Sequence, residues 1–309
     1  MKTDQPLFLN EEQVRQHLRM ADLIPAMEKA LIEFSAGKVT QPVRSVINVD
    51  PPGGFLGLMP AHTADGLGLK AVTFYPSNAE LGIPTHMATI FLMDPETGTP
   101  LAIMDGRLIT EMRTAAVSAA ATKLLAPADA KILAILGSGV QARSHVEALR
   151  LLRQFEEIRV WSPTKEHAER FGKEVGGRAM SAEEAVRGAD VVVTTTNSKT
   201  PVLKGSWLKA GCHVNAIGAC RADWRELDDE AMSNVVFVDS REGAMKESGD
   251  VILSDAKIYA ALGEALAAKV PSRSNETTIF KSLGMAVEDI AAAMVVYRKL
   301  ISELESPID

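Results

Sequence analysis

A cysteine at the end of a buried segment is the first residue whose chemistry needs explaining. Residues 214–227 read VNAIGACRADWREL, so an apolar run opens into a glycine and then into Cys220, Arg221 and Asp223. Polar residues that follow a buried strand of an α/β protein lie where such proteins bind ligands. Cys220 therefore has three candidate roles: a nucleophile, a metal ligand, or a replacement for another side chain. The other cysteine lies eight residues earlier, a spacing that fits neither a disulfide framework nor a CxxC zinc site, so we expect no metal.

Three cationic residues also lie in unusual surroundings. Arg44 begins a predicted strand, Lys70 lies within the apolar segment LGLKAVTFY, and Arg113 lies at the start of an Ala-rich helix. Each of them alone could simply extend to solvent from a sheet edge or a helix surface. Because arginine binds carboxylates through paired hydrogen bonds, the three together predict a pocket for a carboxylate substrate. His86 follows a turn and is a candidate proton source, although a lone histidine is more often structural.

The segment KILAILGSGVQARSHVEAL predicts a dinucleotide-binding site. Gly137, Gly139 and Ala142 form the pattern GxGxxA, directly after an apolar strand and at the start of a helix. Gly137 allows a tight turn, Gly139 lets a pyrophosphate approach the backbone, and Ala142 lets helix and strand pack closely. Because four more apolar strands follow, we expect NAD or NADP to bind here, and not a plain glycine turn.

The tip of the next strand bears on the choice between NAD and NADP. An acidic residue at this point would bind the adenosine ribose of NAD. Here the tip consists of Ser162, Pro163, Thr164 and Lys165, without Asp or Glu. Hydroxyl groups and a lysine suit a 2′-phosphate better than a 2′-hydroxyl, so NADP(H) is favoured. NAD(H) is the alternative, because no arginine stands at the tip to bind the phosphate.

The elements that must position these residues fall into two groups. Residues 10–37 predict two helices, and residues 44–105 contain short β-rich runs broken by turn sequences, as in an antiparallel or mixed sheet. After an Ala-rich helix over 107–125, near-continuous apolar strands alternate with helix-length segments, which predicts a parallel doubly wound sheet. The last amphipathic helix follows the nucleotide-binding part and is expected to return to the first domain.

Size and composition set the broad class of the protein. A chain of 309 residues predicts two domains, an α+β substrate and dimerisation domain over 1–125 plus 286–309 and an α/β Rossmann domain over 126–285. The formal charge of −7, with no basic block, argues against nucleic acid and anionic membrane as partners. We see no signal peptide and no apolar run of membrane-spanning length, and with so few cysteines we expect a cytoplasmic protein.

Ordered segments along nearly the whole chain resemble the ornithine cyclodeaminase/mu-crystallin family. They are QPVR, LMPA, LKAVTFY, AIMDG, RTAAVSA, LGSGVQA, AIGACRADWRELDDE, KESGDV and FKSLGMAVED. Within the family the sequence most resembles the mu-crystallin-like ketimine reductases. The resemblance implies a two-domain homodimer with NAD(P) on the Rossmann domain. It also makes Arg44, Lys70 and Arg113 the substrate-carboxylate and catalytic cluster.

The candidate site residues combine these patterns with the resemblance. His86 is a secondary catalytic candidate, and Met59 and Cys220 join the three cations as substrate-binding candidates. The expected cofactor-binding residues are Gly137, Ser138, Gly139, Val140, Gln141, Ser162, Pro163, Thr164, Lys165, Thr195, Ile217, Gly218, Ser282, Leu283 and Gly284. The last three follow from the resemblance alone. Glu247 and Asp250 are expected to lie in a solvated turn, with a loop on the cofactor side as the alternative.

Two departures from the family pattern bear on the reaction. Ornithine cyclodeaminases have an aspartate at the position of Cys220 and a glutamate at that of Gly57, and mu-crystallins have a serine at the former. We interpret Cys220 as a small neutral replacement for a carboxylate. A nucleophilic role would require a thiolate with an activating base; Arg221 could lower the thiol pKa, but no dedicated base is visible. Without the carboxylate a substrate ammonium is hard to deprotonate, whereas reduction of a preformed C=N bond has less need of a base.

The expected function is reduction of the C=N bond of a cyclic 2-imino acid, such as Δ1-piperideine-2-carboxylate, with hydride from NADPH. Arg44 and Arg113 would hold the carboxylate, and Lys70 would stabilise or protonate the imine. The nearest alternative is an alanine or N-alkyl amino acid dehydrogenase acting on a 2-oxo acid and an amine. Ornithine cyclodeamination is less expected because both carboxylates are missing. Binding of a thyroid-hormone-like ligand without turnover would leave Lys70 and the phosphate loop unexplained.

Overall fold

The computed structural model describes residues 5–271, 273 and 275–305. They form two compact units: one runs to Arg113 and resumes at Met285, and the other comprises Thr114–Gly284. The sequence predicts the first boundary at residue 125, where helix α3 (Arg107–Leu125) ends, whereas the units divide inside this helix. A continuous helix shows no change of composition or pattern, so the sequence contains no signal for a division there.

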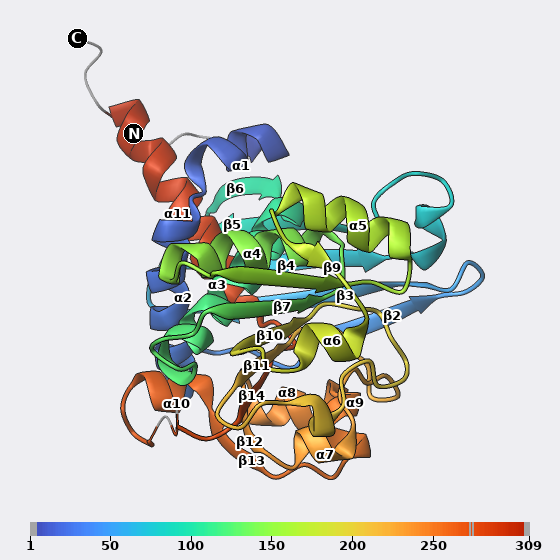
Figure 1. Cartoon of the computed structure of the whole chain (residues 1–309). Coiled ribbons are helices and arrows are strands. Elements are labelled where there is room, and N and C mark those ends of the chain that lie inside the picture. Colours follow the sequence, from blue (N-terminus) through green and yellow to red (C-terminus); the bar gives the residue numbers. More distant parts are fainter. Residues whose placement is uncertain (1–4, 272, 274, 306–309) are drawn as a thin grey trace. The chain divides into compact units, whose positions relative to one another are not determined.

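The first unit is built on a mixed six-stranded sheet in the order β1-β6-β5-β4-β3-β2 (Figure 1). The strands are β1 (Leu7–Leu9), β2 (Ser45–Val49), β3 (Gly54–His62), β4 (Leu67–Phe74), β5 (His86–Met93) and β6 (Pro100–Asp105), with the short 3-10 helix η1 (Pro76–Ala79) between β4 and β5. From β2 to β6, each strand pairs antiparallel with the next strand along the chain, and β1 pairs parallel with β6. The mixed sheet predicted from the β-rich runs and their turn sequences is confirmed.

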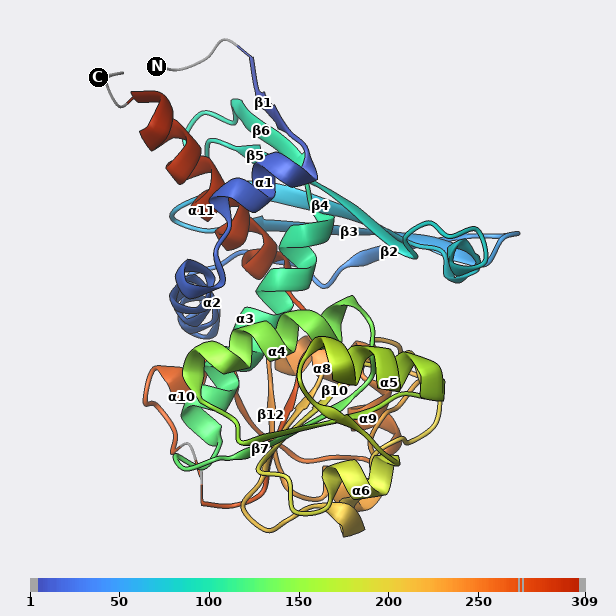
Figure 2. The same ribbon diagram turned by 45° about the horizontal axis from the view of Figure 1, so that its top comes forward.

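The C-terminal helix α11 (Ala286–Glu305) packs on one face of this sheet, against β3, β4 and β5. Helices α1 (Glu11–His17) and α2 (Met20–Ser35) pack in turn against α11 (Figure 2). The contact is close: a Cβ atom at Gly68 would stand 2.5 Å from Ile290 Cδ1. The last helix therefore belongs to the first unit.

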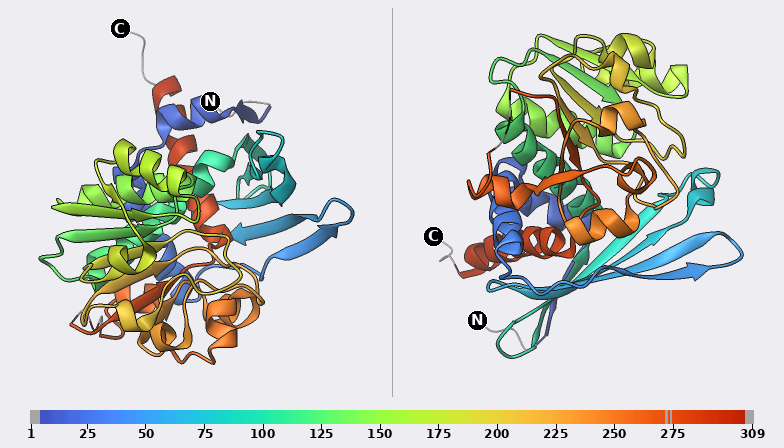
Figure 3. Two further views of the ribbon diagram at one scale, coloured as in Figure 1. Left: turned by 45° about the vertical axis from the view of Figure 1, so that its right-hand side comes forward. Right: turned by 90° about the horizontal axis from the view of Figure 1, so that it is seen from below.

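The opposite face of the sheet carries apolar side chains that remain exposed. Residues paired across neighbouring strands point to the same face, and successive residues alternate between faces. The register therefore places four exposed apolar residues on the face away from α11: Phe8, Ile47, Met87 and Phe91. Their exposed fractions range from 37% to 70%. The right-hand view of Figure 3 shows α11 along the other side of this sheet.

The second unit is built on an eight-stranded sheet in the order β13-β12-β14-β11-β10-β7-β8-β9, in which every pair described is parallel. The strands are β7 (Ile132–Leu136), β8 (Glu157–Trp161), β9 (Arg178–Ala179), β10 (Val191–Thr194), β11 (His213–Ala216), β12 (Val235–Val238), β13 (Ile258–Ala261) and β14 (Thr278–Lys281). Its connecting helices are α4 (Val140–Leu152), α5 (Lys165–Glu174), α6 (Ala182–Val186), η2 (Gly205–Trp207), α7 (Asp229–Met232), α8 (Arg241–Glu247), α9 (Gly249–Leu253) and α10 (Leu262–Leu266).

Helices lie on both faces of this parallel sheet, as its buried strands require. Helices α4 and α5 cover one face and α6 lies on the other (Figure 2). The central strands are fully buried, with every residue of β10 inaccessible to solvent. The predicted doubly wound fold is confirmed. Its strand order reverses between β7 and β10, and ligands bind at the carboxyl ends of the strands beside such a point.

Among the described residues, the helices include none with both the length and the apolar composition of a membrane span.

Candidate active site

Lys70 lies in the middle of β4 and points towards the helix-covered face of the first unit. Alternation along β4 buries Gly68, Lys70, Val72 and Phe74, and the Lys70 residue is only 1% exposed. Its Nζ atom lies 2.7 Å from Asp289 Oδ2 and 3.5 Å from Thr110 Oγ1. A buried ammonium is tolerated only with such partners, because burial removes its hydration. Lys70 is therefore not a surface lysine that extends to solvent.

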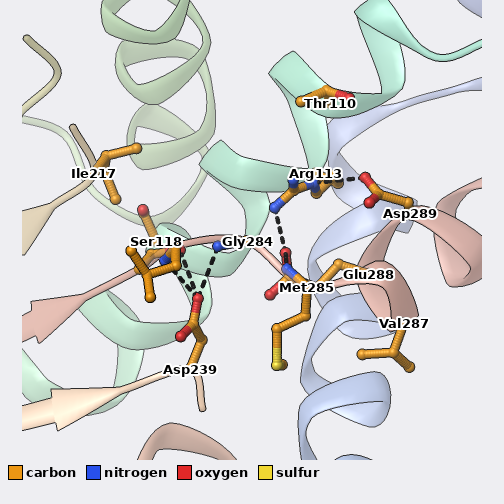
Figure 4. A network of polar contacts seen from close by, with 12 residues as sticks. Thr110, Arg113, Ser118, Ile217, Asp239, Gly284, Met285, Val287, Glu288 and Asp289 are labelled. Atoms are coloured by element: carbon orange, nitrogen blue, oxygen red, sulfur yellow. Dashed lines mark hydrogen bonds and ion pairs between the residues drawn. The ribbon is translucent and has the colours of Figure 1, made fainter. Parts of the chain in front are cut away.

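Arg113 reaches the same carboxylate from helix α3. Its Nε donates to Asp289 Oδ1 at 2.9 Å, and its Nη1 donates to Glu288 Oε2 (Figure 4). Asp289 thus bridges Lys70 and Arg113 with its two oxygens. Two of the three cations predicted from the sequence are thus brought together by a carboxylate that was not predicted.

Glu288 and Asp289 are the site residues that the sequence analysis missed. Both lie in the first turn of α11, and both are completely buried. The helix N-terminus favours negative charge, and Glu288 Oε2 also accepts a hydrogen bond from Met285 N at 3.2 Å. Two acidic residues at the start of a helix are common on exposed helices, so their positions alone did not predict that they are buried. The available signal was their place in the segment FKSLGMAVED together with the apolar stripe that buries this helix.

The surroundings of Lys70 weaken its hold on the proton. Burial lowers the pKa of Lys70 to about 8, and the positive charges of Arg113 and Arg44 act in the same direction against the raising effect of Asp289. For Arg113 burial also opposes the charge, but Asp289 and Glu288 outweigh it and keep the pKa above its ordinary value. At neutral pH the cluster therefore holds a fixed guanidinium beside an ammonium that can give up its proton.

Arg44, Met59 and His86 complete the predicted substrate side. Arg44 is half-buried just before β2, close enough for its charge to affect Lys70. Met59 is buried on β3, directly opposite Lys70 in the register. Lys70 and Arg113 share the carboxylate of Asp289, and the charge of Arg44 acts on Lys70, a concentration of positive charge that suits an anionic ligand.

His86 lies at the start of β5, where its ring packs against Phe74 with 4.4 Å between centroids. Part of the residue is exposed, but protein atoms surround its ring and remove much of the hydration of the charged form. This desolvation, together with the positive charge of Lys70, lowers the pKa of His86 to about 4. His86 is therefore neutral near pH 7, which makes it a poor proton donor compared with Lys70.

The glycine-rich loop of the second unit fits a dinucleotide. Gly137 has φ 135°, in the region that favours glycine, and a Cβ atom there would stand 2.3 Å from Thr195 Oγ1. A Cβ atom at Gly139, the N-cap of α4, would meet only open space, as the approach of a pyrophosphate requires. Thr195 Oγ1 and Gln141 Oε1 are buried without a hydrogen-bond partner among the described residues. These buried atoms are what a polar cofactor would satisfy.

The tip of β8 lies next to this loop. Ser138 Oγ donates to Ser162 Oγ at 3.0 Å, and Thr164 is the N-cap of α5 after Pro163. The side chain of Lys165 is 83% exposed. Val140, at the first position of α4, is 51% exposed although it is apolar, which leaves the helix start open.

Backbone groups at the ends of β11 and β14 supply the remaining cofactor candidates. Ile217 continues β11 through a hydrogen bond from its N to Thr194 O at 2.9 Å, and Gly218 follows it. The backbone N atoms of Leu283 and Gly284 both donate to Asp239 Oδ2, at 2.6 and 2.8 Å (Figure 4). Asp239, at the end of β12, thus fixes the segment that starts at Ser282.

One expectation about the polar residues that follow β11 changes. Cys220 is exposed, and its Sγ donates to Ile217 O at 3.6 Å. The expectation of a solvated turn is wrong for Asp250, which is completely buried and accepts hydrogen bonds from Glu226 N and Leu227 N. Glu247 is half-buried. Sequence alone missed this because an acidic, Gly-containing segment is usually exposed, and here a buried lysine, Lys281, compensates the charge.

Together, these features define a class of protein: a nucleotide-binding α/β protein with a Rossmann-type unit and a separate sheet unit that carries a buried cationic cluster. The family model for the ornithine cyclodeaminase/mu-crystallin family matches residues 4–303. The chain belongs to this family, as the resemblance of its segments predicted.

Individual relatives agree with this assignment. The sequence is 52% identical over 302 residues to the ketimine reductase mu-crystallin of Mus musculus, with 94% of this chain and 96% of that protein covered. The structure matches Δ1-pyrroline-2-carboxylate reductase of Thermococcus litoralis, solved with NADH and L-proline, with a TM-score of 0.92, 36% identity, and 98% and 100% of the two chains covered. An archaeal alanine dehydrogenase dimer with bound NAD also has a TM-score of 0.92, at 34% identity, with 98% and 99% covered. With the fit of the glycine-rich loop, these relatives support a nicotinamide nucleotide as cofactor.

Proposed function

We propose that this protein reduces the C=N bond of a cyclic 2-imino acid, such as Δ1-piperideine-2-carboxylate, to the corresponding cyclic amino acid. The observation that carries the proposal is Lys70, a buried ammonium with a pKa of about 8 that lies 2.7 Å from Asp289 and within the influence of the charges of Arg113 and Arg44. An imino acid needs a cation for its carboxylate and a proton for its nitrogen, and this cluster offers both. The ketimine reductase and Δ1-pyrroline-2-carboxylate reductase among the relatives support the same reaction class.

Each residue of the cluster has a separate task in this proposal. A bound nicotinamide nucleotide supplies the hydride that the imine carbon receives. Arg44 and Arg113 hold the substrate carboxylate, and Arg113 is itself kept in place by Glu288 and Asp289. Lys70 Nζ donates its proton to the imine nitrogen, so that one hydride and one proton together complete the amine. Asp289 holds Lys70 at 2.7 Å and limits the movement of the donor.

An Arg44→Ala variant tests the carboxylate contact. We expect kcat/KM for the imino acid to fall about 10- to 100-fold, because a charge-assisted hydrogen bond contributes about 1.5–3 kcal/mol. The dissociation constant of the reduced cofactor should stay unchanged, since Arg44 belongs to the first unit and the glycine-rich loop to the second. Arg44→Lys, which keeps the charge, should restore part of the loss. Unchanged turnover in Arg44→Ala would remove this arginine from the mechanism.

We propose NADP(H) as the preferred cofactor. The tip of β8 offers Ser162 and the exposed Lys165 and has no carboxylate to repel a 2′-phosphate.

A Ser162→Asp variant is expected to lower the ratio of kcat/KM for NADPH to that for NADH about tenfold or more. The new carboxylate would repel the 2′-phosphate of NADPH and accept a hydrogen bond from the 2′-hydroxyl of NADH. Lys165→Ala should weaken NADPH binding and leave NADH binding unchanged. Steady-state kinetics with both cofactors gives these ratios. A wild-type protein that prefers NADH would contradict the proposal.

We also propose that the protein is a homodimer that buries the exposed apolar face of its six-stranded sheet. Large exposed apolar patches on otherwise polar proteins mark association surfaces, and four apolar side chains share this face. We also propose that the protein works in a reducing compartment such as the cytoplasm, since both of its cysteines are free thiols.

Sedimentation velocity should find the wild type at twice the chain mass of 33.2 kDa. The double variant Ile47→Asp/Phe91→Asp is expected to sediment as a monomer, because two buried carboxylates would oppose association. Leu151→Asp, an exposed apolar position on α4, is the matched control and should stay dimeric. A double variant that remains dimeric would show that another surface forms the interface.

A further inference from the structure

A second buried ionic cluster lies at the strand ends of the second unit, and the reaction proposed above does not use it. Its members Lys281, Asp250 and Glu226 are all completely buried. Lys281, the last residue of β14, has its Nζ 3.0 Å from Asp250 Oδ2, and the same Nζ donates to the carbonyl of Gly218. Burial opposes the charge of Lys281, but the carboxylate of Asp250 outweighs it and raises the pKa.

Glu226 binds the backbone N of Gly218, the residue whose carbonyl accepts a hydrogen bond from Lys281. Its Oε2 accepts hydrogen bonds from Gly218 N at 2.8 Å and Thr194 Oγ1 at 2.7 Å. Its Oε1 accepts from both the N and the Oγ1 of Thr196 at 2.6 Å. The carboxyl group therefore joins the carboxyl ends of β10 and β11, and both polar backbone atoms of Gly218 are bound by buried ionisable side chains. Burial raises the pKa of Glu226.

The backbone at this point has little freedom. A Cβ atom at Gly218 would stand 2.0 Å from Thr196 O, so only glycine fits. The next residue, Ala219, has φ 55°, a left-handed conformation that costs a non-glycine residue about 1–2 kcal/mol. Such a conformation persists only where the surroundings enforce it, and it is concentrated at functional sites. The turn formed by Gly218, Ala219 and Cys220 is therefore held in a strained shape by Lys281 and Glu226.

Stability alone is a weak explanation for this cluster. Desolvation of buried ions offsets much of their attraction, and an apolar replacement of similar size is often as stable. The cluster does, however, fix backbone beside the point where the strand order reverses, which is where this fold binds its ligand. The adenosine half of a dinucleotide belongs to the β7–β8 side of that point, so the turn after β11 belongs to the nicotinamide half.

We propose that Lys281 is a positioning residue that, with Asp250 and Glu226, sets the Gly218–Cys220 turn against the nicotinamide half of the cofactor. The inference rests on the proposed nicotinamide-dependent function. It assigns Lys281 no contact with the cofactor or with the reacting atoms: Lys281 acts through the carbonyl of Gly218. It also gives Asp250 a task, since its Oδ1 fixes Glu226 N and Leu227 N at 2.7 and 2.9 Å while its Oδ2 pairs with Lys281.

The test compares affinity for the whole cofactor with affinity for the cofactor lacking its nicotinamide. Calorimetry would measure NADPH against 2′-phospho-ADP-ribose, and NADH against ADP-ribose, for the full-length protein. Lys281→Met/Asp250→Asn removes one buried charge of each sign, so the net charge of the cluster does not change, and asparagine keeps the acceptor for Glu226 N. We expect this double variant to lower the ratio of the two affinities about tenfold, since a misplaced turn affects only the nicotinamide half.

Thr278→Val is the matched control. It lies at the opposite end of the same strand and removes a buried hydrogen bond of 2.8 Å to His213. It should lower thermal stability without changing the ratio of affinities. If the double variant folds and keeps the wild-type ratio, or if the wild type gains no affinity from the nicotinamide, the inference is overturned. A wild type that binds neither reduced cofactor would instead overturn the proposed function on which it rests.

Discussion

Replacing Lys70 by methionine is expected to lower kcat for imine reduction about 10³-fold or more, while the affinity for the reduced cofactor remains that of the wild type. General acid catalysis contributes about 10²–10⁴-fold, and the charge that stabilises the developing amine is lost as well. Methionine matches the length of the lysine stem, and Asp289 keeps Arg113 as its partner, so the fold should tolerate the change. Steady-state turnover, cofactor titration and circular dichroism would measure the three quantities.

The pH dependence of the wild type follows from the same lysine. Lys70 acts in its protonated form, and its pKa is lowered to about 8, so kcat should be steady below that pH and fall as the pH rises through it. Lys70→Arg is the control, since arginine stays charged in this range; its residual activity should lack the fall above pH 8. A fall that persists in Lys70→Arg belongs to the substrate or to another group. Near-normal turnover of Lys70→Met would exclude Lys70 as the proton donor.

Asp289→Asn is the second change with a large expected effect, on both stability and chemistry. Asparagine keeps the shape of the side chain but removes a buried charge shared by Lys70 and Arg113. Removing one partner of a buried ion pair costs about 3–5 kcal/mol, so the free energy of unfolding should fall by that order. The charge of Asp289 raises the pKa of Lys70, so in the variant that pKa should move below about 8 and the fall in activity should begin at lower pH.

Glu288→Gln provides the matched control for Asp289→Asn. Glu288 is the neighbouring residue on α11, equally buried, and it binds Arg113, whereas the carboxylate recorded beside Lys70 is that of Asp289. It should lower the free energy of unfolding without moving the pH at which activity falls. Denaturant unfolding and pH–rate profiles of the two variants therefore separate packing from chemistry. If both variants keep the wild-type pH profile, Asp289 is a structural residue only.

Much of the fold is readable from the sequence, because its patterns are strong where burial is complete. The strands of the parallel sheet appear as continuous apolar runs, and GxGxxA marks the first crossover. The shortest strands were not predicted, because β1 has three residues and β9 has two, too few to show the alternation of a strand. The division inside α3 escaped because one continuous helix serves both units.

The candidate site was only half readable. Lys70 and Arg113 stand out because a cation in an apolar context needs an explanation. Their partners Glu288 and Asp289 do not stand out, since acids are favoured in the first turn of any helix. The same holds for Asp250, whose burial depends on Lys281, thirty-one residues away in the sequence. Pairing between distant charges is a property of the folded chain, and no local pattern encodes it.

Imine reduction can be measured by mixing the purified protein with NADPH and Δ1-piperideine-2-carboxylate and following the loss of reduced-nicotinamide absorbance. Ornithine with NAD, and pyruvate with methylamine and NADPH, run in parallel. We predict fast turnover of the cyclic imine alone, with the amino acid as product. Turnover only with ornithine would contradict the proposed imine reduction, since another group would then have to do the work of the aspartate that the family resemblance implies at the position of Cys220. The absence of turnover with all three would contradict it as well.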